Sequence, residues 1–179
     1  ELRRVIANWE HPKRARGQCH GPEYAPMFNK PYIPALNEWW EDHRLWELGQ
    51  HPSQKDKEPS LPRYYAQWGG NPPNVERYRP DWKPEEMTWY QVYETVSEGT
   101  PVTPPFATKE ELVEYLVANG DFWDQHRRAD GVTHMSCNPW TRKQAELFVL
   151  GDGWAPSLVV CNGKLMSGVE AMAEMQDNK

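Results

Sequence analysis

The side chains best suited to chemistry in this chain are a few histidines and cysteines. His134 and Cys137 are separated by two residues, which is a tolerable spacing for two zinc ligands. Cys19 and His20 could complete a set of four, but adjacent ligands fit a tetrahedral site poorly. We therefore expect loop histidines and buried thiols, with no metal and no other cofactor. Zinc binding by His126, His134 and Cys137 stays open as an alternative.

Patterns typical of catalysis are missing from the sequence. The chain has no G-x-S-x-G nucleophile motif, no phosphate-binding loop and no dinucleotide-binding fingerprint. Paired carboxylates at 85–86 and 110–111 fall at expected helix starts, where negative charge is favourable to the helix dipole. We therefore predict that the protein is not an enzyme. The alternative left open is a hydrolase whose catalytic triad is assembled by folding from residues that are distant in sequence.

Charge and cysteine content limit the class of protein further. The net charge of −6 disfavours unspecific phosphate binding as the main activity. Residues 1–18 carry five basic and two acidic side chains, so we expect a basic, weakly ordered arm there. Three cysteines cannot all pair within one chain, which favours a reducing, cytosolic setting. No apolar run approaches the roughly 18 residues of a membrane span, so we expect no membrane partner.

Aromatic residues give the strongest indication of function. The chain has 10 Trp, and seven of them lie before residue 90 in a segment rich in proline. Trp and Tyr on a stiff backbone offer a protein partner large contact area at low entropic cost. The predicted binding residues are Trp39, Trp40, Trp46, Tyr64, Tyr65, Trp68, Val102 and Thr103. Single-stranded nucleic acid is an alternative partner, because Arg63 could hold phosphate while the two tyrosines that follow it stack on bases. It is less favoured, because the basic residues are scattered among acidic ones and the net charge is negative.

The pattern of residues predicts an α+β fold that is mostly helical. We expect a Pro/Trp-rich irregular N-terminal half with one helix over 36–48, and one small C-terminal β-hairpin at Asn162-Gly163. Three capping boxes, in which a Thr precedes Glu or Gln by three residues, predict helix starts at Thr88, Thr108 and Thr141. A last short helix is expected over Gly168 to Met175. The segment 96–106, with three prolines, is interpreted as a rigid connector, with Val102 and Thr103 as a possible edge for a partner.

These elements predict one domain, C-terminal to the basic arm. The domain covers 19–179, with the irregular half over 19–87 and the helices and hairpin over 88–179.

Several blocks of sequence carry a resemblance to a known family. They are N-W-E-H-P at 8–12, W-Y-Q-V-Y-E-T-V-S-E-G-T-P-V-T-P-P-F at 89–106, T-K-E-E-L-V-E-Y-L-V-A-N-G-D at 108–121, G-W-A-P-S at 153–157 and S-G-V-E-A-M at 167–172. In these blocks the chain resembles a family of uncharacterised small proteins of tailed bacteriophages and prophages. The resemblance implies a phage or prophage origin and a bacterial host cytoplasm, and it assigns no role to any residue.

The composition and the resemblance together lead to one functional prediction with alternatives. We expect a non-catalytic protein that binds a bacterial host protein, as an inhibitor of host defence. A virion or assembly component, located in the particle, is the first alternative. An accessory protein that binds single-stranded nucleic acid or zinc is the second.

Overall fold

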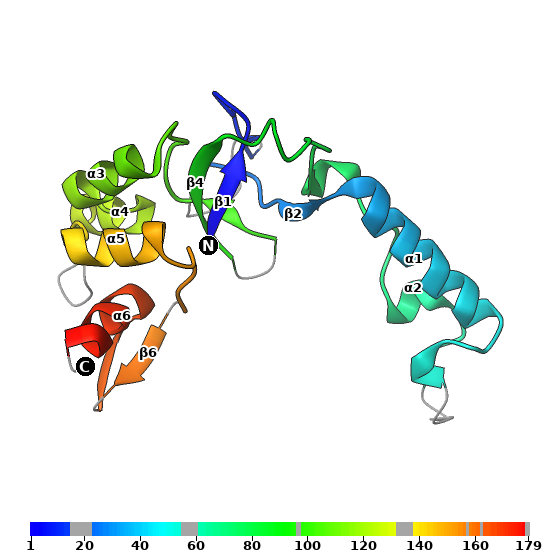
Figure 1. Ribbon diagram of the computed structural model, residues 1–179. Helices are drawn as coiled ribbons and strands as arrows, with labels where there is room; N and C mark the ends of the chain where they lie inside the picture. The colour runs from blue at the N-terminus through cyan, green and yellow to red at the C-terminus, as the bar shows by residue number, and fades with distance from the viewer. Residues whose placement is uncertain are drawn as a thin grey trace. The chain divides into compact units, whose positions relative to one another are not determined.

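The chain has an α+β fold, as the sequence predicts, and its helices hold more residues than its strands (Figure 1). The computed structural model describes residues 1–14, 23–54, 61–95, 98–131, 138–156, 158–161 and 163–177. The chain forms two compact units: unit 1 comprises Glu1–Ala25 and Trp82–Lys179, and unit 2 comprises Pro26–Asp81. This division differs from the expected one, in which an arm over 1–18 precedes one domain over 19–179.

Unit 1 contains a three-stranded antiparallel sheet in the order β1-β4-β5. Its strands are β1 (Leu2–Val5), β4 (Trp89–Glu94) and β5 (Thr100–Pro101). β1 pairs with β4 along its whole length, from Leu2 opposite Val92 to Val5 opposite Trp89, and Figure 1 shows the two arrows side by side. Because Arg3 and Val5 are both buried in this pairing, the expectation of a weakly ordered arm is wrong for the start of the chain.

The strand β4 stands where the sequence predicts a helix. That prediction took Thr88 and Gln91 as a capping box, but Gln91 is buried and its Nε2 donates to the backbone carbonyl of Thr103 at 2.8 Å. The residues W-Y-Q-V-Y are mostly aromatic or β-branched, and such residues suit a pleated strand with neighbours on both sides. The predicted helix from Trp89 onwards is therefore wrong.

In the described part of unit 1, four helices follow the sheet along the chain. They are α3 (Lys109–Asn119), α4 (Phe122–Ala129), α5 (Arg142–Leu150) and α6 (Gly168–Asp177). The boxes at Thr108 and Thr141 are confirmed, because in each the hydroxyl and the side chain three residues later cap the backbone reciprocally. α4 begins with a box formed by Asp121 and Asp124, which departs from the usual pattern because Asp stands where that pattern has Glu or Gln.

The hydrophobic core of unit 1 lies between α3, α5 and β4. Leu112 and Leu116 of α3 are fully buried, and they meet Phe148 and Val149 of α5 in one cluster that also contains Val92. Burying each of these aliphatic side chains is worth about 1.5–3 kcal/mol. Each of these two helices therefore buries one face in the core.

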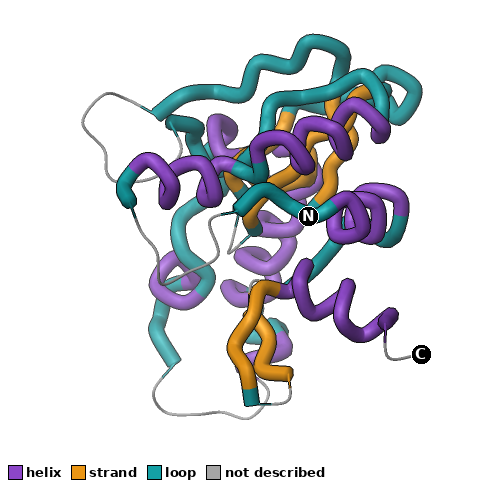
Figure 2. The backbone as a smooth tube through the Cα atoms, turned by 90° about the vertical axis from the view of Figure 1, so that its left-hand side faces the viewer, coloured by secondary structure: helices purple, strands orange, loops and turns teal. Residues whose placement is uncertain are grey.

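The predicted C-terminal hairpin is also confirmed. β6 (Leu158–Cys161) pairs antiparallel with β7 (Lys164–Ser167), and the turn residue Asn162 lies outside the described residues. Gly163 has a φ of 75°, a backbone conformation that side chains other than glycine rarely adopt. Met166 and Ala171 are buried where the hairpin packs on α6, and Figure 2 shows the two orange strands beside the last helix.

Unit 2 is organised around one long helix. Its elements are β2 (Phe28–Pro31), α1 (Tyr32–Glu47), the 3-10 turn η1 (Pro52–Gln54), α2 (Tyr65–Trp68), the 3-10 turn η2 (Val75–Arg77) and β3 (Tyr78–Arg79). α1 covers residues 36–47 of the helix predicted over 36–48, and it begins four residues earlier, because Pro34 is tolerated in a first helical turn. The short strands β2 and β3 pair in parallel.

Candidate functional site

Unit 2 is held together by stacked aromatic rings. Trp46 of α1 and Tyr65 of α2 are both buried, with ring centroids 5.8 Å apart. The Trp46 Nε1 donates to the carbonyl of Arg63 at 3.3 Å, and the Tyr65 hydroxyl donates to Asp42 Oδ2 at 3.4 Å. Trp46 and Tyr65 were predicted to lie on a binding surface. This prediction is wrong, because unit 2 uses these two rings as its core.

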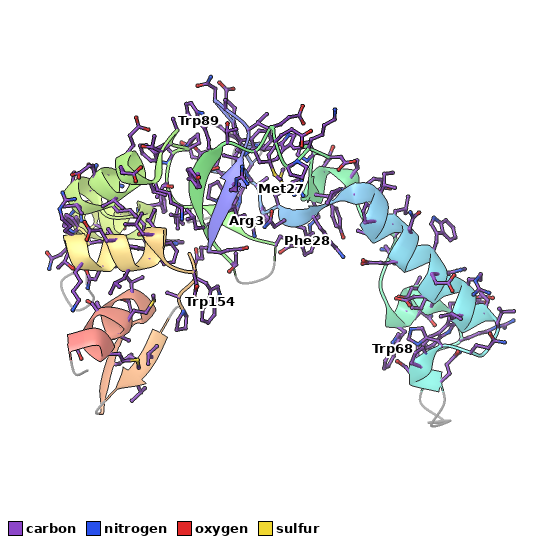
Figure 3. All side chains as sticks on the ribbon, in the orientation of Figure 1. Arg3, Met27, Phe28, Trp68, Trp89 and Trp154 are labelled. Atoms are coloured by element: carbon purple, nitrogen blue, oxygen red, sulfur yellow. The ribbon has the colours of Figure 1, made fainter. Side chains whose placement is uncertain are left out.

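Other predicted aromatic residues of unit 2 are exposed. Tyr64 retains 53% of its accessible surface and Trp68 retains 50%, and Figure 3 shows Trp68 on α2. The Trp68 ring stacks on Trp46, at a centroid distance of 5.7 Å and an angle of 24°. The guanidinium of Arg63 lies 5.3 Å from the centre of the Tyr64 ring. We call Arg63, Tyr64 and Trp68 the aromatic rim.

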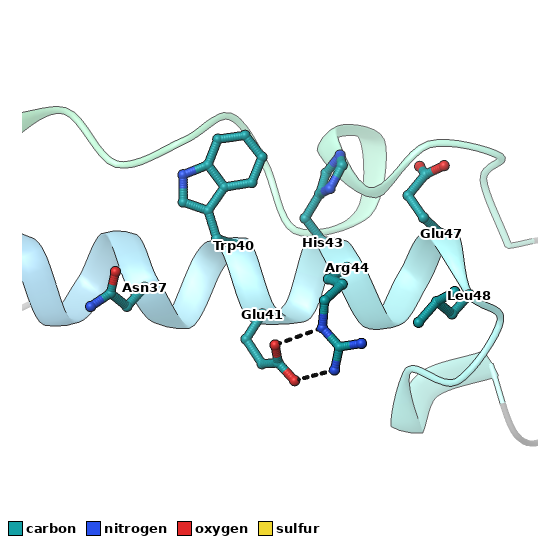
Figure 4. Close-up of a pocket in the computed structure, with 7 residues that line it drawn as sticks. All are labelled: Asn37, Trp40, Glu41, His43, Arg44, Glu47 and Leu48. Carbon is teal, nitrogen blue, oxygen red and sulfur yellow. Dashed lines mark hydrogen bonds and ion pairs between the residues drawn. The ribbon is translucent and has the colours of Figure 1, made fainter.

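The outer face of α1 carries a second exposed surface. Trp40 retains 53% of its surface and meets Trp39 edge-on at 5.1 Å, while Trp39 is half-buried. Figure 4 shows a shallow hollow beside Trp40. It is lined by Asn37, Trp40, Glu41, His43, Arg44, Glu47 and Leu48. Below Trp40, Arg44 donates two hydrogen bonds to Glu41, at 2.9 and 2.7 Å, and these bonds lower the pKa of the exposed Glu41 carboxyl.

Val102 and Thr103 lie inside unit 1. They retain 6% and 3% of their surface, and the Val102 N–H donates to the Val92 carbonyl at 2.9 Å. The Val92 N–H donates to Thr103 Oγ1 at 3.1 Å, and the Phe122 N–H donates to the Val102 carbonyl at 2.8 Å. The prediction that these residues form an edge for a partner is therefore wrong. Proline keeps the segment extended, and an extended segment beside β4 can continue the sheet through these bonds.

A buried hydrogen-bond network surrounds His11 in unit 1. Its Nε2 lies 2.7 Å from the carbonyl of Ala25 and must donate, since a carbonyl only accepts. Its Nδ1 lies 3.1 Å from the Tyr93 hydroxyl, which is also 3.0 Å from Gln91 Oε1. Burial and the guanidinium of Arg3 lower the pKa of His11, which favours the neutral ring, while the one hydroxyl proton of Tyr93 is donated to Gln91 Oε1. Burial raises the pKa of that hydroxyl to about 12.

Two carboxyl groups share the buried start of α4. Asp121 and Asp124 each accept a backbone N–H of the other, at 3.0–3.1 Å. Asp124 also accepts from Arg127 at 2.7 Å and from Trp140 Nε1 at 3.0 Å. Burial, together with the neighbouring Asp124 carboxylate, raises the pKa of Asp121 to about 6. These contacts cap α4 and tie its first turn to Trp140, two residues before α5, so the pair has a structural role.

Four of the five candidate zinc ligands, Cys19, His20, His134 and Cys137, lie outside the described residues. Within the ranges that the structure covers, no three His, Cys, Asp or Glu side chains are grouped to hold a metal. His126 is described, and it contacts Asp130 at 3.3 Å and stacks on Phe122.

No helix in the described part of the chain has the length and apolar character to cross a bilayer.

The candidate site is therefore the exposed part of unit 2, formed by the aromatic rim and the outer face of α1. The sequence does contain a signal that distinguishes the buried rings of α1 from the exposed ones. Trp40 and Trp46 are six residues apart, which places their side chains roughly 120° apart around the helix axis. Comparison with protein-family models, with curated proteins and with solved structures finds no match to this chain.

Proposed function

We propose that this protein acts without catalysis, by binding another protein through the aromatic rim of unit 2. The observation that carries the proposal is the half-exposed Trp68 ring, stacked flat on the buried Trp46. A ring held in this way has already lost its rotational freedom, so a partner that covers it loses little further entropy. Trp, Tyr and Arg are also the residue types that contribute most to protein interfaces.

The rim has the composition of an interface centre. Trp68 offers a flat apolar face, while Tyr64 offers a ring and a hydroxyl. Arg63, next to the Tyr64 ring, can donate to carbonyl or carboxylate groups of a partner. We expect truncation of Trp68 to weaken binding by about 2 kcal/mol or more.

The partner in this proposal is a bacterial host protein. The support comes from the resemblance of residues 89–121 and of the shorter blocks to phage and prophage proteins. A protein of this origin would act in the cytoplasm of the infected bacterium. Inhibition of a host defence protein by occupying its surface would then require no catalytic group.

Affinity capture tests the proposal. The purified full chain is immobilised and incubated with bacterial lysate, next to a variant with Tyr64→Ala and Trp68→Ala. Trp154→Ala is the matched control, because Trp154 is a 58% exposed Trp of unit 1 (Figure 3). We expect one bacterial protein to be retained by the wild type and by the control, and to be lost from the rim variant.

Two results would contradict the proposal. One is a wild type that captures no protein at all, and the other is a captured protein that the rim variant retains equally well. Quenching of Trp fluorescence by a single-stranded oligonucleotide, weakening steeply with salt and abolished by the rim variant, would replace the protein partner with nucleic acid.

A further inference from the structure

We propose that the outer face of α1 pairs with the same face of a second copy of this chain, with the two helices antiparallel. The inference goes beyond the proposed function, because it concerns a different surface of unit 2 and a different partner. It is argued from five residues, which we call the α1 stripe: Ile33, Asn37, Trp40, Arg44 and Leu48.

The α1 stripe is a single line of side chains along the helix. Its members are spaced by three or four residues, which places them on one face of a helix with 3.6 residues per turn. The buried residues of α1, Ala35 and Trp46, lie on the opposite face. From Ile33 to Leu48 the stripe extends over about 22 Å, at 1.5 Å per residue.

The α1 stripe contains three large apolar side chains that are more than half exposed. Ile33 retains 57% of its surface, Trp40 53% and Leu48 55%. Large apolar side chains aligned on one face are typical of a surface that is covered by a partner. The aromatic core of unit 2, formed by Trp46 and Tyr65, is complete without them.

The order of residues in the stripe is almost symmetric about Trp40. Ile33 lies seven residues before Trp40, and Leu48 lies eight residues after it. A twofold axis next to Trp40 therefore places Ile33 of one copy opposite Leu48 of the other. The two Trp40 rings then meet at the axis, and each Arg44 lies opposite Asn37.

Charge selects this antiparallel arrangement over a parallel one. In a parallel pair, Arg44 would face Arg44 and Glu41 would face Glu41, and both contacts are repulsive. In the antiparallel pair, each Arg44 lies opposite Asn37, which is one helical turn from Glu41 of the same copy. The Glu41–Arg44 ion pair within each of the two helices can thus be exchanged for a pair across the axis, two pairs for two.

A dimer of this kind would change how the aromatic rim works. Tyr64 and Trp68 do not belong to the α1 stripe, so pairing leaves both rims accessible to a partner. A dimer with two accessible aromatic rims is a bivalent binder, and its overall affinity for a partner exceeds that of a single rim.

Sedimentation equilibrium of the purified full chain tests the dimer directly. The contact is small, so we expect a dissociation constant on the order of 10–100 µM, and the protein is measured across that range. Trp40→Glu should weaken the dimer by about 100-fold, because it places two carboxylates at the axis. The control Trp154→Glu introduces the same charge at an exposed Trp of unit 1 and should leave the dimer unchanged.

Charge exchange tests the orientation. Glu41→Arg and Arg44→Glu should each weaken self-association by about tenfold, because each creates two repulsive contacts across the axis. An equimolar mixture of the two variants should restore association, because the mixed dimer has two attractive contacts. Circular dichroism checks that the variants remain folded, as expected for exposed positions.

Three outcomes would overturn the inference. They are a wild type that stays monomeric at several hundred micromolar, a dimer that Trp40→Glu leaves intact, and a mixture of charge variants that associates no better than its components. Because these measurements use only the purified chain, their failure leaves the capture experiment on the rim unaffected. A partner that competes with self-association would show that a different protein covers the stripe.

Discussion

Unit 1 closes its core with aliphatic side chains from several elements, whereas unit 2 builds its core from a few aromatic rings on one long helix. In unit 1, Leu112 and Leu116 are fully enclosed between α3, α5 and the sheet. In unit 2, the buried Trp46 is covered on one side by Trp68, which is itself half exposed. The difference shows that the same kind of residue can serve as core and as surface when the unit is small.

This difference supports the proposal that the binding surface lies on unit 2. A small unit has a high ratio of surface to volume, so it cannot enclose every ring that stabilises it. Rings that remain partly exposed are held in place by their buried neighbours and are available to a partner. The larger unit 1 encloses a cluster of apolar side chains and also polar groups such as His11 and Asp124.

The largest expected effect is the loss of the central ring of unit 2. We expect Trp46→Ala to destabilise unit 2 by about 3–5 kcal/mol, because it removes the ring on which Tyr65 and Trp68 pack. Hydrogen exchange followed by mass spectrometry should show α1 losing protection while α3 keeps it. Trp40→Ala, an exposed Trp on the same helix, should change stability by less than about 0.5 kcal/mol in dilute protein. Loss of protection in α3 would show that the two cores are not separate.

The corresponding change in unit 1 is the truncation of an enclosed leucine. We expect Leu116→Ala to cost about 3 kcal/mol, because the surrounding helices cannot collapse fully into the cavity. Chemical denaturation measures the loss, and Leu150→Ala, at an exposed position of α5, is the matched control. If Leu116→Ala cost no more than the control, the contrast between an enclosed and an open core would be wrong.

The two cores also differ in how far the sequence predicted them. The helices α3 and α5 were predicted because their capping boxes and their buried stripes are local patterns. In unit 2, Trp40 and Trp46 were both predicted as binding residues, although they point in different directions from α1. Periodicity indicated a helix there, but it could not identify which rings the short α2 would cover.

The errors in unit 1 arose where contacts are distant in sequence. β4 was predicted as a helix because Thr88 and Gln91 imitate a capping box, while its pairing with β1 joins residues about 90 apart. The burial of Val102 and Thr103 depends on the same sheet. No local pattern indicated the network around His11, because His11, Ala25 and the β4 residues Gln91 and Tyr93 come from three separate segments.

A smaller effect follows from the buried carboxyl group of unit 1. The pKa of Asp121 is raised from 3.8 to about 6, so between these values the folded state holds a proton that the unfolded state has released. Stability should therefore fall as the pH rises from about 4 to 6 and stay lower above that range. Asp121→Asn keeps an acceptor for the cap without the charge. We expect it to stabilise the protein by about 1–2 kcal/mol at pH 7.

Thermal unfolding at several pH values measures this effect. Asp152→Asn, at an exposed position of unit 1, is the control and should leave the profile unchanged. A variant Asp121→Asn that is less stable than the wild type at pH 7 would show that the carboxylate itself is required at the start of α4. Unit 2, whose ion pairs are exposed, should contribute little to the profile.

The smallest effect concerns His11 and has the opposite sign. Burial and Arg3 lower the pKa of His11, so as the pH falls below about 6.5 the unfolded chain takes up a proton before the folded one does. The stability that neutral His11 provides is therefore complete above pH 6.5 and is lost as the pH falls, by at most about 1.4 kcal/mol per pH unit. In an Asp121→Asn background, which removes the opposing slope, His11→Gln should flatten the remaining dependence. If stability still depends on pH in this double variant, the proton uptake belongs to another group. If the Asp121→Asn single variant already shows no such dependence, His11 titrates equally in the folded and unfolded states.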